Sequence, residues 1–259
     1  MDKESIDKWL DWATYELPPG PLLFPQRYMI NAQKAFYGWY LLWLMVQYNN
    51  FSTGAYLYLV FHGSYGYFWL LKEATFPDAS FKKPITLGSL LFSLFVGIGP
   101  LFWLGYYYMS SEDERNERDI HPVKMSFCIW LFTVGVVVMM GSDGQKYWML
   151  RERKGLITDG LFKFTRNPNY LGESMIYLTF GIMINEFYSW LILANLLGLV
   201  FHLRMHAKDL RMQGRPGFKE YKANTWQMLP KLFNSTAASV VIYGVFGWWL
   251  WEHQEVILS

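Results

Sequence analysis

The chain alternates between long apolar runs that contain no charged residue and shorter polar segments that carry most of the charges. A helix needs about 17–25 mainly apolar residues to span a bilayer. The second, third and fourth runs reach this length alone, the second when it is counted from Phe51. The first and last runs reach this length when the polar residues that flank them are included, because such side chains can snorkel to the membrane surface. The pattern predicts an all-α, polytopic integral membrane protein with about seven transmembrane helices. The runs are Ala35–Tyr48, Tyr56–Leu71, Thr86–Met109, Met125–Ser142, Ser174–Asn185, Phe187–Phe201 and Thr236–Trp251.

The fifth and sixth runs are short, and only Asn185-Glu186 separates them, so a turn there predicts a short helical hairpin. Lysine and arginine are distributed unequally around the seven runs. With the N-terminus placed inside, 20 of the 23 basic residues fall in inside segments. Membrane proteins keep such a bias toward their inner face, so we predict an inside N-terminus and an outside C-terminus. The inside segments are 1–34, 72–85, 143–173 and 202–235.

The composition agrees with a membrane protein, because 17% of the residues are charged against about 25% in soluble domains. The mean hydropathy of +0.08 is low only because the charges are segregated. Cys128 is the one cysteine, which excludes a disulfide framework and a cysteine-based metal site. A net charge of +2 gives no broad basic surface. We therefore expect membrane lipids as partners and no nucleic acid.

Residues 1–34 predict an interfacial segment and no cleavable targeting signal. Acidic residues outnumber basic ones among the first twenty, whereas secretory signals begin basic and transit peptides contain few acids. Apolar residues recur at helical spacing, which predicts an amphipathic helix on the membrane surface, with docking against a partner as the alternative. For the protein as a whole, we expect an integral membrane location, in either the endoplasmic reticulum or the inner mitochondrial membrane. The apolar residues are Ile6, Trp9, Leu10, Ala13 and Leu17.

The candidate chemistry lies between residues 141 and 235, where two basic inside segments flank the predicted hairpin. The hairpin returns the chain to one face, so the two segments meet there. Guanidinium and ammonium groups beside amides and phenols suit a phosphate-bearing ligand, and plain positive-inside anchoring is the alternative. Glu173 is a costly acid beside hydrocarbon unless it binds a ligand or stabilises a helix N-terminus. The cluster contains Lys146, Arg166, Arg204, Lys208, Arg211 and Arg215, with Asn167, Asn169, Tyr170 and Tyr221.

Three motifs follow one another in this region. Gln145-Lys146 comes first, and Gly160-Leu-Phe then precedes Arg166-Asn-Pro-Asn-Tyr-Leu-Gly-Glu173. A closing stretch contains Lys208-Asp209, Gly217-Phe-Lys-Glu-Tyr221 and Trp226 to Pro230. Over about residues 141–233, these motifs resemble the R-H-P-N-Y-x-G-[ED] signature and closing stretch of the steroid 5-alpha-reductase and sterol-reductase C-terminal domains. The wider superfamily includes the isoprenylcysteine and phospholipid methyltransferases.

The resemblance implies an NADPH site enclosed by these motifs and the hairpin. It assigns the nicotinamide end to Asn169 and Glu173. Asn167 stands where the family has histidine, which removes a group that titrates near neutral pH, and we keep it among the cofactor-binding candidates. In the methyltransferase branch the same cavity holds S-adenosylmethionine, and an acidic pair stands where this chain has Lys208-Asp209. The family's phosphate, ribose and amide contacts map to Lys146, Arg166, Tyr170, Arg204, Lys208 and Tyr221.

We therefore expect a membrane-embedded, NADPH-dependent reductase of a double bond in a lipid or steroid-like substrate. Three alternatives stay open. The chain is a noncatalytic subunit of a larger membrane complex, for example a respiratory one, or holds only a phospholipid, or is an S-adenosylmethionine-dependent membrane methyltransferase. The expected ranges are 1–34 for the interfacial segment, 35–140 for the lipid-substrate half, 141–235 for the cofactor half and 236–259 for the last helix and tail.

The sequence does not place the catalytic acid. In the steroid reductases a Tyr/Glu pair from the N-terminal half acts as the acid, and here Glu73 and the tyrosines of residues 56–67 correspond by location only. His202 and His206 have the i, i+4 spacing of a metal pair. No third ligand accompanies them in the sequence, so we expect no metal.

Overall fold

The computed structural model describes Ser5 and residues 8–9, 11–111 and 120–258. Helices account for 79% of the residues, which confirms that the chain is mainly α-helical. The chain forms two compact units, and each is described by itself. Unit 1 comprises Met1–Asp119 and Glu186–Ala207, and unit 2 comprises Ile120–Asn185 and Lys208–Ser259. The four functional ranges assigned from the sequence stay predictions.

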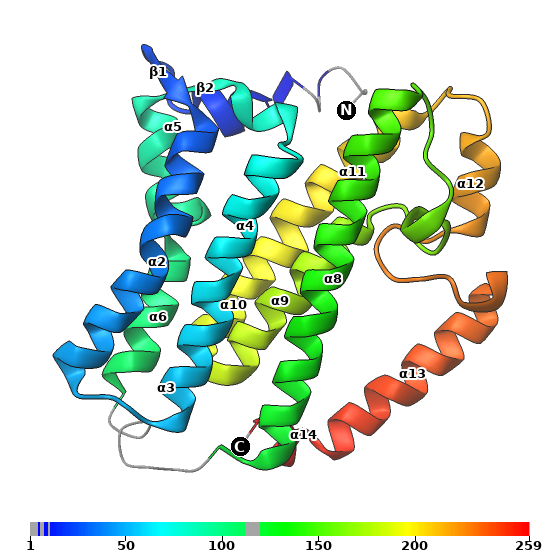
Figure 1. Ribbon diagram of the computed structural model, residues 1–259. Helices are drawn as coiled ribbons and strands as arrows, with labels where there is room; N and C mark the ends of the chain where they lie inside the picture. The colour runs from blue at the N-terminus through cyan, green and yellow to red at the C-terminus, as the bar shows by residue number, and fades with distance from the viewer. Residues whose placement is uncertain (1–4, 6–7, 10, 112–119, 259) are drawn as a thin grey trace. The chain divides into compact units, whose positions relative to one another are not determined.

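Unit 1 is built around α2 (Gln26–Tyr48), which packs beside both α4 (Ser64–Thr75) and α6 (Pro100–Ser110), as Figure 1 shows. A two-stranded antiparallel sheet joins β1 (Leu22–Pro25) to β2 (Pro84–Thr86). Several short π-helical turns continue a neighbouring α-helix. The remaining elements are η1 (Trp12–Glu16), α3 (Thr53–Tyr58), η2 (Leu59–Gly63), η3 (Ala79–Lys82), α5 (Leu87–Phe92), η4 (Ser93–Gly97), α10 (Phe187–Leu193), η6 (Ala194–Phe201) and the start of α11 (His202–Met212).

The contact between α2 and α6 depends on a small residue. A Cβ atom on Gly105 would lie 2.7 Å from the Tyr37 hydroxyl and 2.7 Å from a methyl group of Leu41. The Tyr37 hydroxyl donates a 2.7 Å hydrogen bond to the carbonyl oxygen of Leu101. Glycine at position 105 therefore lets a buried tyrosine reach the α6 backbone.

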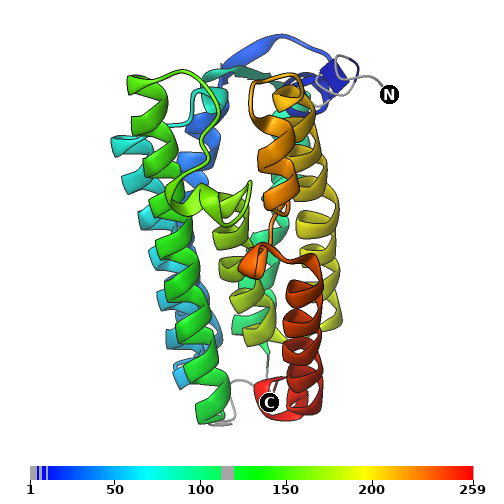
Figure 2. The same ribbon diagram turned by 90° about the vertical axis from the view of Figure 1, so that its right-hand side faces the viewer.

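Unit 2 is organised by α8 (Pro122–Glu152) and α9 (Pro168–Ile184), which pack along each other. A Cβ atom on Gly172 would lie 2.5 Å from the backbone nitrogen of Met139 and 2.6 Å from the carbonyl oxygen of Gly135. The α9 backbone therefore lies directly against the α8 backbone at Gly172. The other elements, seen from the side in Figure 2, are η5 (Gly160–Lys163), α12 (Phe218–Asn224), η7 (Leu232–Asn234), α13 (Thr236–Glu252) and α14 (Gln254–Leu258).

Three helical stretches among the described residues are long and apolar enough to cross a membrane, and they indicate a membrane-associated protein. They are Leu87–Ser110, Pro122–Glu152 and Phe187–Met212. They correspond to the third, fourth and sixth apolar runs of the sequence. The other four runs are also helical, in α2, in α3 to α4, in α9 and in α13. Seven spans and an inside N-terminus stay predictions.

The helix breaks at Asn185-Glu186, where the sequence predicts a turn. Asn185 follows α9 with φ 49° in the left-handed region, a conformation that asparagine tolerates at helix C-termini. Glu186 begins the next helix through a capping box with Ser189. The predicted separation of the fifth and sixth runs is therefore confirmed.

Only part of the predicted N-terminal surface helix lies in the described part of the chain. Trp9 and Trp12 are exposed, as a helix lying on a membrane surface requires. Ile6 and Leu10, on which the periodicity also depends, lie outside the described residues. Residues 112–119 also lie outside them.

Candidate functional site

A buried ion pair joins the signature to the closing stretch in unit 2. Arg166 Nε donates to Asp209 Oδ1 at 3.0 Å, and Arg166 Nη2 donates to Asp209 Oδ2 at 2.8 Å. Both side chains are 7% exposed, and Arg166 Nη1 also donates to the carbonyl oxygen of Thr225. Such a two-bond pair fixes the guanidinium in one orientation. The two basic segments therefore meet, as the sequence predicts.

Asn167 continues this network. Its Nδ2 donates to the carbonyl oxygen of Gln227 at 2.8 Å, and its Oδ1 accepts from Lys208 Nζ at 2.9 Å. Lys208 Nζ also donates to the carbonyl oxygen of Arg166 at 3.2 Å. An amide offers one donor side and one acceptor side, as a neutral imidazole does. Asparagine at the family's histidine position therefore fills a buried hydrogen-bonding role without titrating.

Residues 225–235, which we call the strap, lie against the signature. The backbone N–H of Arg166 donates to the carbonyl oxygen of Trp226 at 3.1 Å, and that of Lys231 donates to the carbonyl oxygen of Phe164 at 3.2 Å. The Tyr221 hydroxyl, just before the strap, donates to the carbonyl oxygen of Phe162 at 2.7 Å. Burial raises the pKa of the Tyr221 phenol, and the nearby Arg166 charge only partly opposes this. Tyr221 is therefore a neutral donor that ties α12 to the signature.

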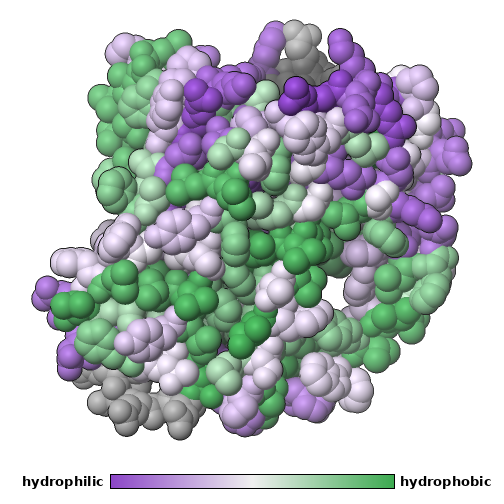
Figure 3. Space-filling view, in the orientation of Figure 1, coloured by the Kyte–Doolittle hydropathy of each residue, from purple (hydrophilic) through white to green (hydrophobic). Residues whose placement is uncertain are grey.

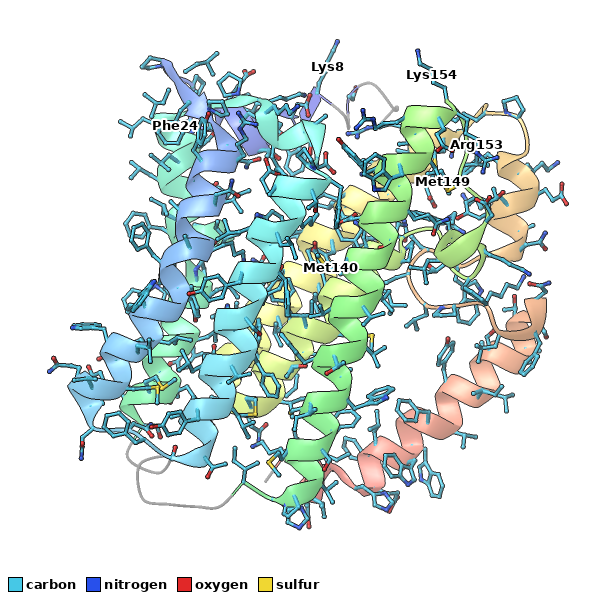
Figure 4. All side chains as sticks on the ribbon, viewed as in Figure 1. Lys8, Phe24, Met140, Met149, Arg153 and Lys154 are labelled. Carbon is cyan, nitrogen blue, oxygen red and sulfur yellow. The ribbon has the colours of Figure 1, made fainter. Side chains whose placement is uncertain are left out.

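The glutamine of the first motif has a structural role. Gln145 Nε2 donates to the carbonyl oxygen of Asp159 at 2.8 Å, and Gln145 Oε1 accepts from the backbone N–H of Leu161 at 3.0 Å. Between these residues Gly160 has φ +57°, and a Cβ atom there would collide with the Gln145 amide. Figure 4 shows Arg153 at this end of α8, where it pairs with Asp159 at 2.9 Å. The glutamine and glycine of the two motifs thus form one loop clamp.

The remaining candidates of unit 2 are less buried. Asn169, Tyr170 and Glu173 lie in the first two turns of α9 and are partly exposed, as is Lys146 on α8. Lys146 lies near enough to Lys208 for its charge to act on that ammonium group. We call these four partly exposed residues the open group. Four other candidates donate hydrogen bonds to protein groups. They are Arg166, Asn167, Lys208 and Tyr221.

Arg204 lies in the part of α11 that belongs to unit 1. Burial raises the pKa of Tyr15, and the positive charges of Arg204 and Lys83 oppose that shift. Tyr15 itself donates from its hydroxyl to the carbonyl oxygen of Ser80 at 3.0 Å. In unit 1, Arg204 therefore lies near Tyr15, and its assignment to a cofactor stays a prediction.

Unit 1 contains a buried group that the sequence reasoning missed. His62 Nδ1 and the Tyr58 hydroxyl are 3.1 Å apart, and the ring of Tyr37 lies 3.8 Å from the His62 ring, centroid to centroid. All three side chains are buried. The available signal was a histidine four residues after a tyrosine in an apolar run. Glu73, the acid expected by location, is only half-buried.

In the part of the chain that the structure describes, no group of three or more His, Cys, Asp or Glu side chains is placed to hold a metal ion. The rings of His202 and His206 stack with centroids 6.5 Å apart.

Residues 101–225 match the family model described as "Protein of unknown function (DUF1295)", a family associated with steroid 5-alpha-reductase-like membrane proteins. This match supports the broad resemblance to steroid 5-alpha-reductase-like membrane proteins. The matched range contains the signature and most of the closing stretch, and it ends where the strap begins. Comparison with curated proteins and with solved structures found no match.

Proposed function

We propose that the chain is a seven-span, membrane-embedded reductase that uses NADPH to saturate a double bond in a lipid or steroid-like substrate. The observation that carries the proposal is the buried Arg166–Asp209 pair. It holds the closing stretch against the start of α9, and the open group lies beside this point. The reductase-associated family match supports the same assignment.

The open group fits a dinucleotide by its chemistry. A helix N-terminus favours negative charge, and Lys146 adds a cation on α8. The Glu173 carboxylate accepts hydrogen bonds and suits the carboxamide of a nicotinamide. Lys208 donates two described hydrogen bonds, and an ammonium group has three donors. When bound, NADPH supplies the hydride, whereas the residues of this chain bind and orient it.

Reduction of a double bond also requires a proton at the second carbon. We assign this proton to the Tyr58 hydroxyl in unit 1, which lies 3.1 Å from His62 Nδ1. Replacing Tyr58 by Phe should remove turnover and leave NADPH binding unchanged, as measured by NADPH oxidation and calorimetry.

The structure also favours a second candidate, a noncatalytic subunit of a larger membrane complex. Arg166, Asn167 and Tyr221, which the resemblance assigns to a cofactor, are buried and donate hydrogen bonds to protein groups. If these residues serve only to stabilise the fold, the chain does not need to bind a nucleotide.

Calorimetry with NADPH on the purified full chain separates the two candidates. The reductase requires binding, and Glu173→Gln should weaken it while Glu152→Gln, an exposed acid at the end of α8, leaves it unchanged. Absence of NADPH binding, together with isolation of the chain only in a stoichiometric complex, would establish the second candidate.

The proposed topology has its own test. In a Cys128→Ser background, single cysteines at positions 163, 211 and 255 are labelled with a membrane-impermeant maleimide in sealed vesicles. Positions 163 and 211 should react from one side and position 255 from the other. Labelling of all three from one side would contradict seven spans.

A further inference from the structure

The last long helix, α13, is apolar on every side and packs on little else. Ser239 is its one buried residue. Its exposed side chains follow one another through whole turns, so they do not leave one face for packing. Figure 3 shows hydrophobic surface where α13 lies and hydrophilic surface above it, where α12 lies. The exposed apolar residues are Val240, Val241, Ile242, Val245, Phe246, Trp248, Trp249 and Trp251.

The rest of unit 2 contacts α13 at few points. The Tyr243 hydroxyl, in the middle of the helix, donates to the carbonyl oxygen of Pro230 in the strap at 2.9 Å. Beyond the end of α13, the carbonyl oxygen of Leu258 in α14 accepts from Lys124 Nζ at 3.1 Å and from Asn185 Nδ2 at 3.2 Å. Figure 1 shows α13 running at an angle to α8 and approaching it only near α14. The exposed apolar side chains of α13 therefore require an apolar medium around them.

The ends of α13 identify this medium as a lipid layer. Its 17 residues span about 25 Å at roughly 1.5 Å per residue, close to the thickness of about 30 Å of a hydrocarbon core. Trp248, Trp249 and Trp251 cluster at its C-terminal end, as aromatic residues do at a membrane interface.

Three lysines lie on segments that contact one another near the other end of α13. Lys231 Nζ donates to the carbonyl oxygen of Ala223 at 2.6 Å, beside Lys222. The Lys231 backbone N–H bonds to Phe164, the neighbour of Lys163. We call Lys163, Lys222 and Lys231 the lysine cluster. Phosphates are the anions found at this depth of a membrane, and basic groups at the surface attract anionic lipids.

Large apolar side chains are exposed beside the lysine cluster. Phe164 is 56% exposed, and Phe233 in η7 is 85% exposed. Phe233 has φ 52°, in the left-handed region that bulky residues rarely adopt. A backbone strain that presents a phenylalanine outward suits insertion among acyl chains, with the ammonium groups at headgroup level.

We propose that the strap and α13 form a binding site for an anionic glycerophospholipid. Its phosphate lies on the lysine cluster, and its acyl chains lie along Phe233 and the valines of α13. The charge of the cluster favours a lipid over an apolar helix of another protein, because such a helix would leave the lysines without an anion. The site rests on the proposed membrane topology and does not require NADPH.

Native mass spectrometry of the delipidated full chain tests this site with phosphatidylglycerol and phosphatidylcholine of the same acyl composition. Phosphatidylglycerol should bind more tightly. Each lysine removed near a membrane surface should weaken anionic-lipid binding about fivefold. Lys163→Gln with Lys231→Gln should therefore weaken it roughly twenty-five-fold. Lys154→Gln, at the far end of α8 in Figure 4, is the matched control and should have no effect.

Two further variants keep the test decisive. Lys231→Arg preserves the charge and should preserve binding, which separates charge from loss of the bond to Ala223. Gly244→Leu fills an open position on α13, which would disrupt a packed protein helix and leave lipid binding intact. Equal binding of both lipids, no effect of the two Lys→Gln changes, or a protein partner lost in Gly244→Leu would overturn the proposal. NADPH calorimetry on the same samples reports separately on the proposed activity.

Discussion

The two halves of the signature differ in their surroundings, although they are adjacent in sequence. Residues 165–168 are buried, and Arg166 and Asn167 donate hydrogen bonds to protein groups. Asn169, Tyr170 and Glu173 lie in the first two turns of α9 and are partly exposed. The first half holds the closing stretch in place. The difference teaches that one motif can contain a part buried against distant segments of the chain and a part that stays partly exposed.

The largest effect should come from the buried half. Arg166→Ala leaves the Asp209 carboxylate buried without its partner, which costs about 3–5 kcal/mol. Thermal unfolding in detergent should show a large loss of stability. The double variant Arg166→Met/Asp209→Leu, which removes both charges, should recover much of it. Unchanged stability of Arg166→Ala with weaker NADPH binding would assign Arg166 to the ligand and not to the fold.

The glycine of the signature should have the next largest effect. An alanine Cβ at position 172 would lie 2.5 Å from the Met139 backbone nitrogen, and overpacking of this kind costs about 1–3 kcal/mol. Gly172→Ala should therefore lower the unfolding temperature. Gly198→Ala, where nothing lies within 4 Å of the added atom, is the control. If the two variants unfold alike, close packing of α8 on α9 is not the reason for the glycine.

The exposed half should respond in binding more than in stability. Glu173→Gln keeps the size of the side chain and removes its charge, and a charge-assisted hydrogen bond contributes about 1.5–3 kcal/mol. NADPH affinity should fall on the order of tenfold or more, with a smaller change in unfolding temperature than for Gly172→Ala. A variant that loses stability but binds normally would move Glu173 into the architectural half.

The smallest effect concerns alkaline pH. The pKa of Tyr221 in the folded chain is raised above its ordinary value of 10.0. The folded state therefore holds this proton more tightly than the unfolded state. The resulting stability is complete below about pH 10 and is lost as the pH rises above it. Between pH 10 and 11 the native chain should lose about 1 kcal/mol more than Tyr221→Phe. If the stabilities of the native chain and of Tyr221→Phe fall by the same amount between pH 10 and 11, Tyr221 is not buried as a neutral donor.

Much of the fold could be predicted because apolar length and charge distribution act locally. The seven runs are all helical, and the break at Asn185-Glu186 is where two polar residues interrupt the apolar pattern. The meeting of the two basic segments followed from topology. The number of spans could not be settled in this way, because α9 and α13 are short helices whose placement depends on their surroundings.

The candidate site was predicted as a set of residue types and not as a set of roles. Basic residues near a signature suggest phosphate, and nothing in the sequence distinguishes Arg166 from Lys146. The structure separates them, because the Asp209 carboxylate, 43 positions away in the chain, bonds to Arg166, whereas Lys146 on α8 is partly exposed. Gln145, read as part of a family motif, proved to clamp Gly160 and Leu161. Tyr58 is one of the tyrosines of residues 56–67 that correspond to the acid by location only, and its buried contact with His62 is seen only in the structure.

By itself the sequence determined a mainly helical, membrane-associated chain, with its basic segments joined around one signature. Hydrophobicity and helical periodicity fix these properties because both depend on neighbouring residues. Only the tertiary structure decided which polar side chains are buried with partners and which remain open, as for Asn167 and Asn169. Burial makes an unpaired charge or amide costly, and the partners that remove this cost come from distant parts of the chain.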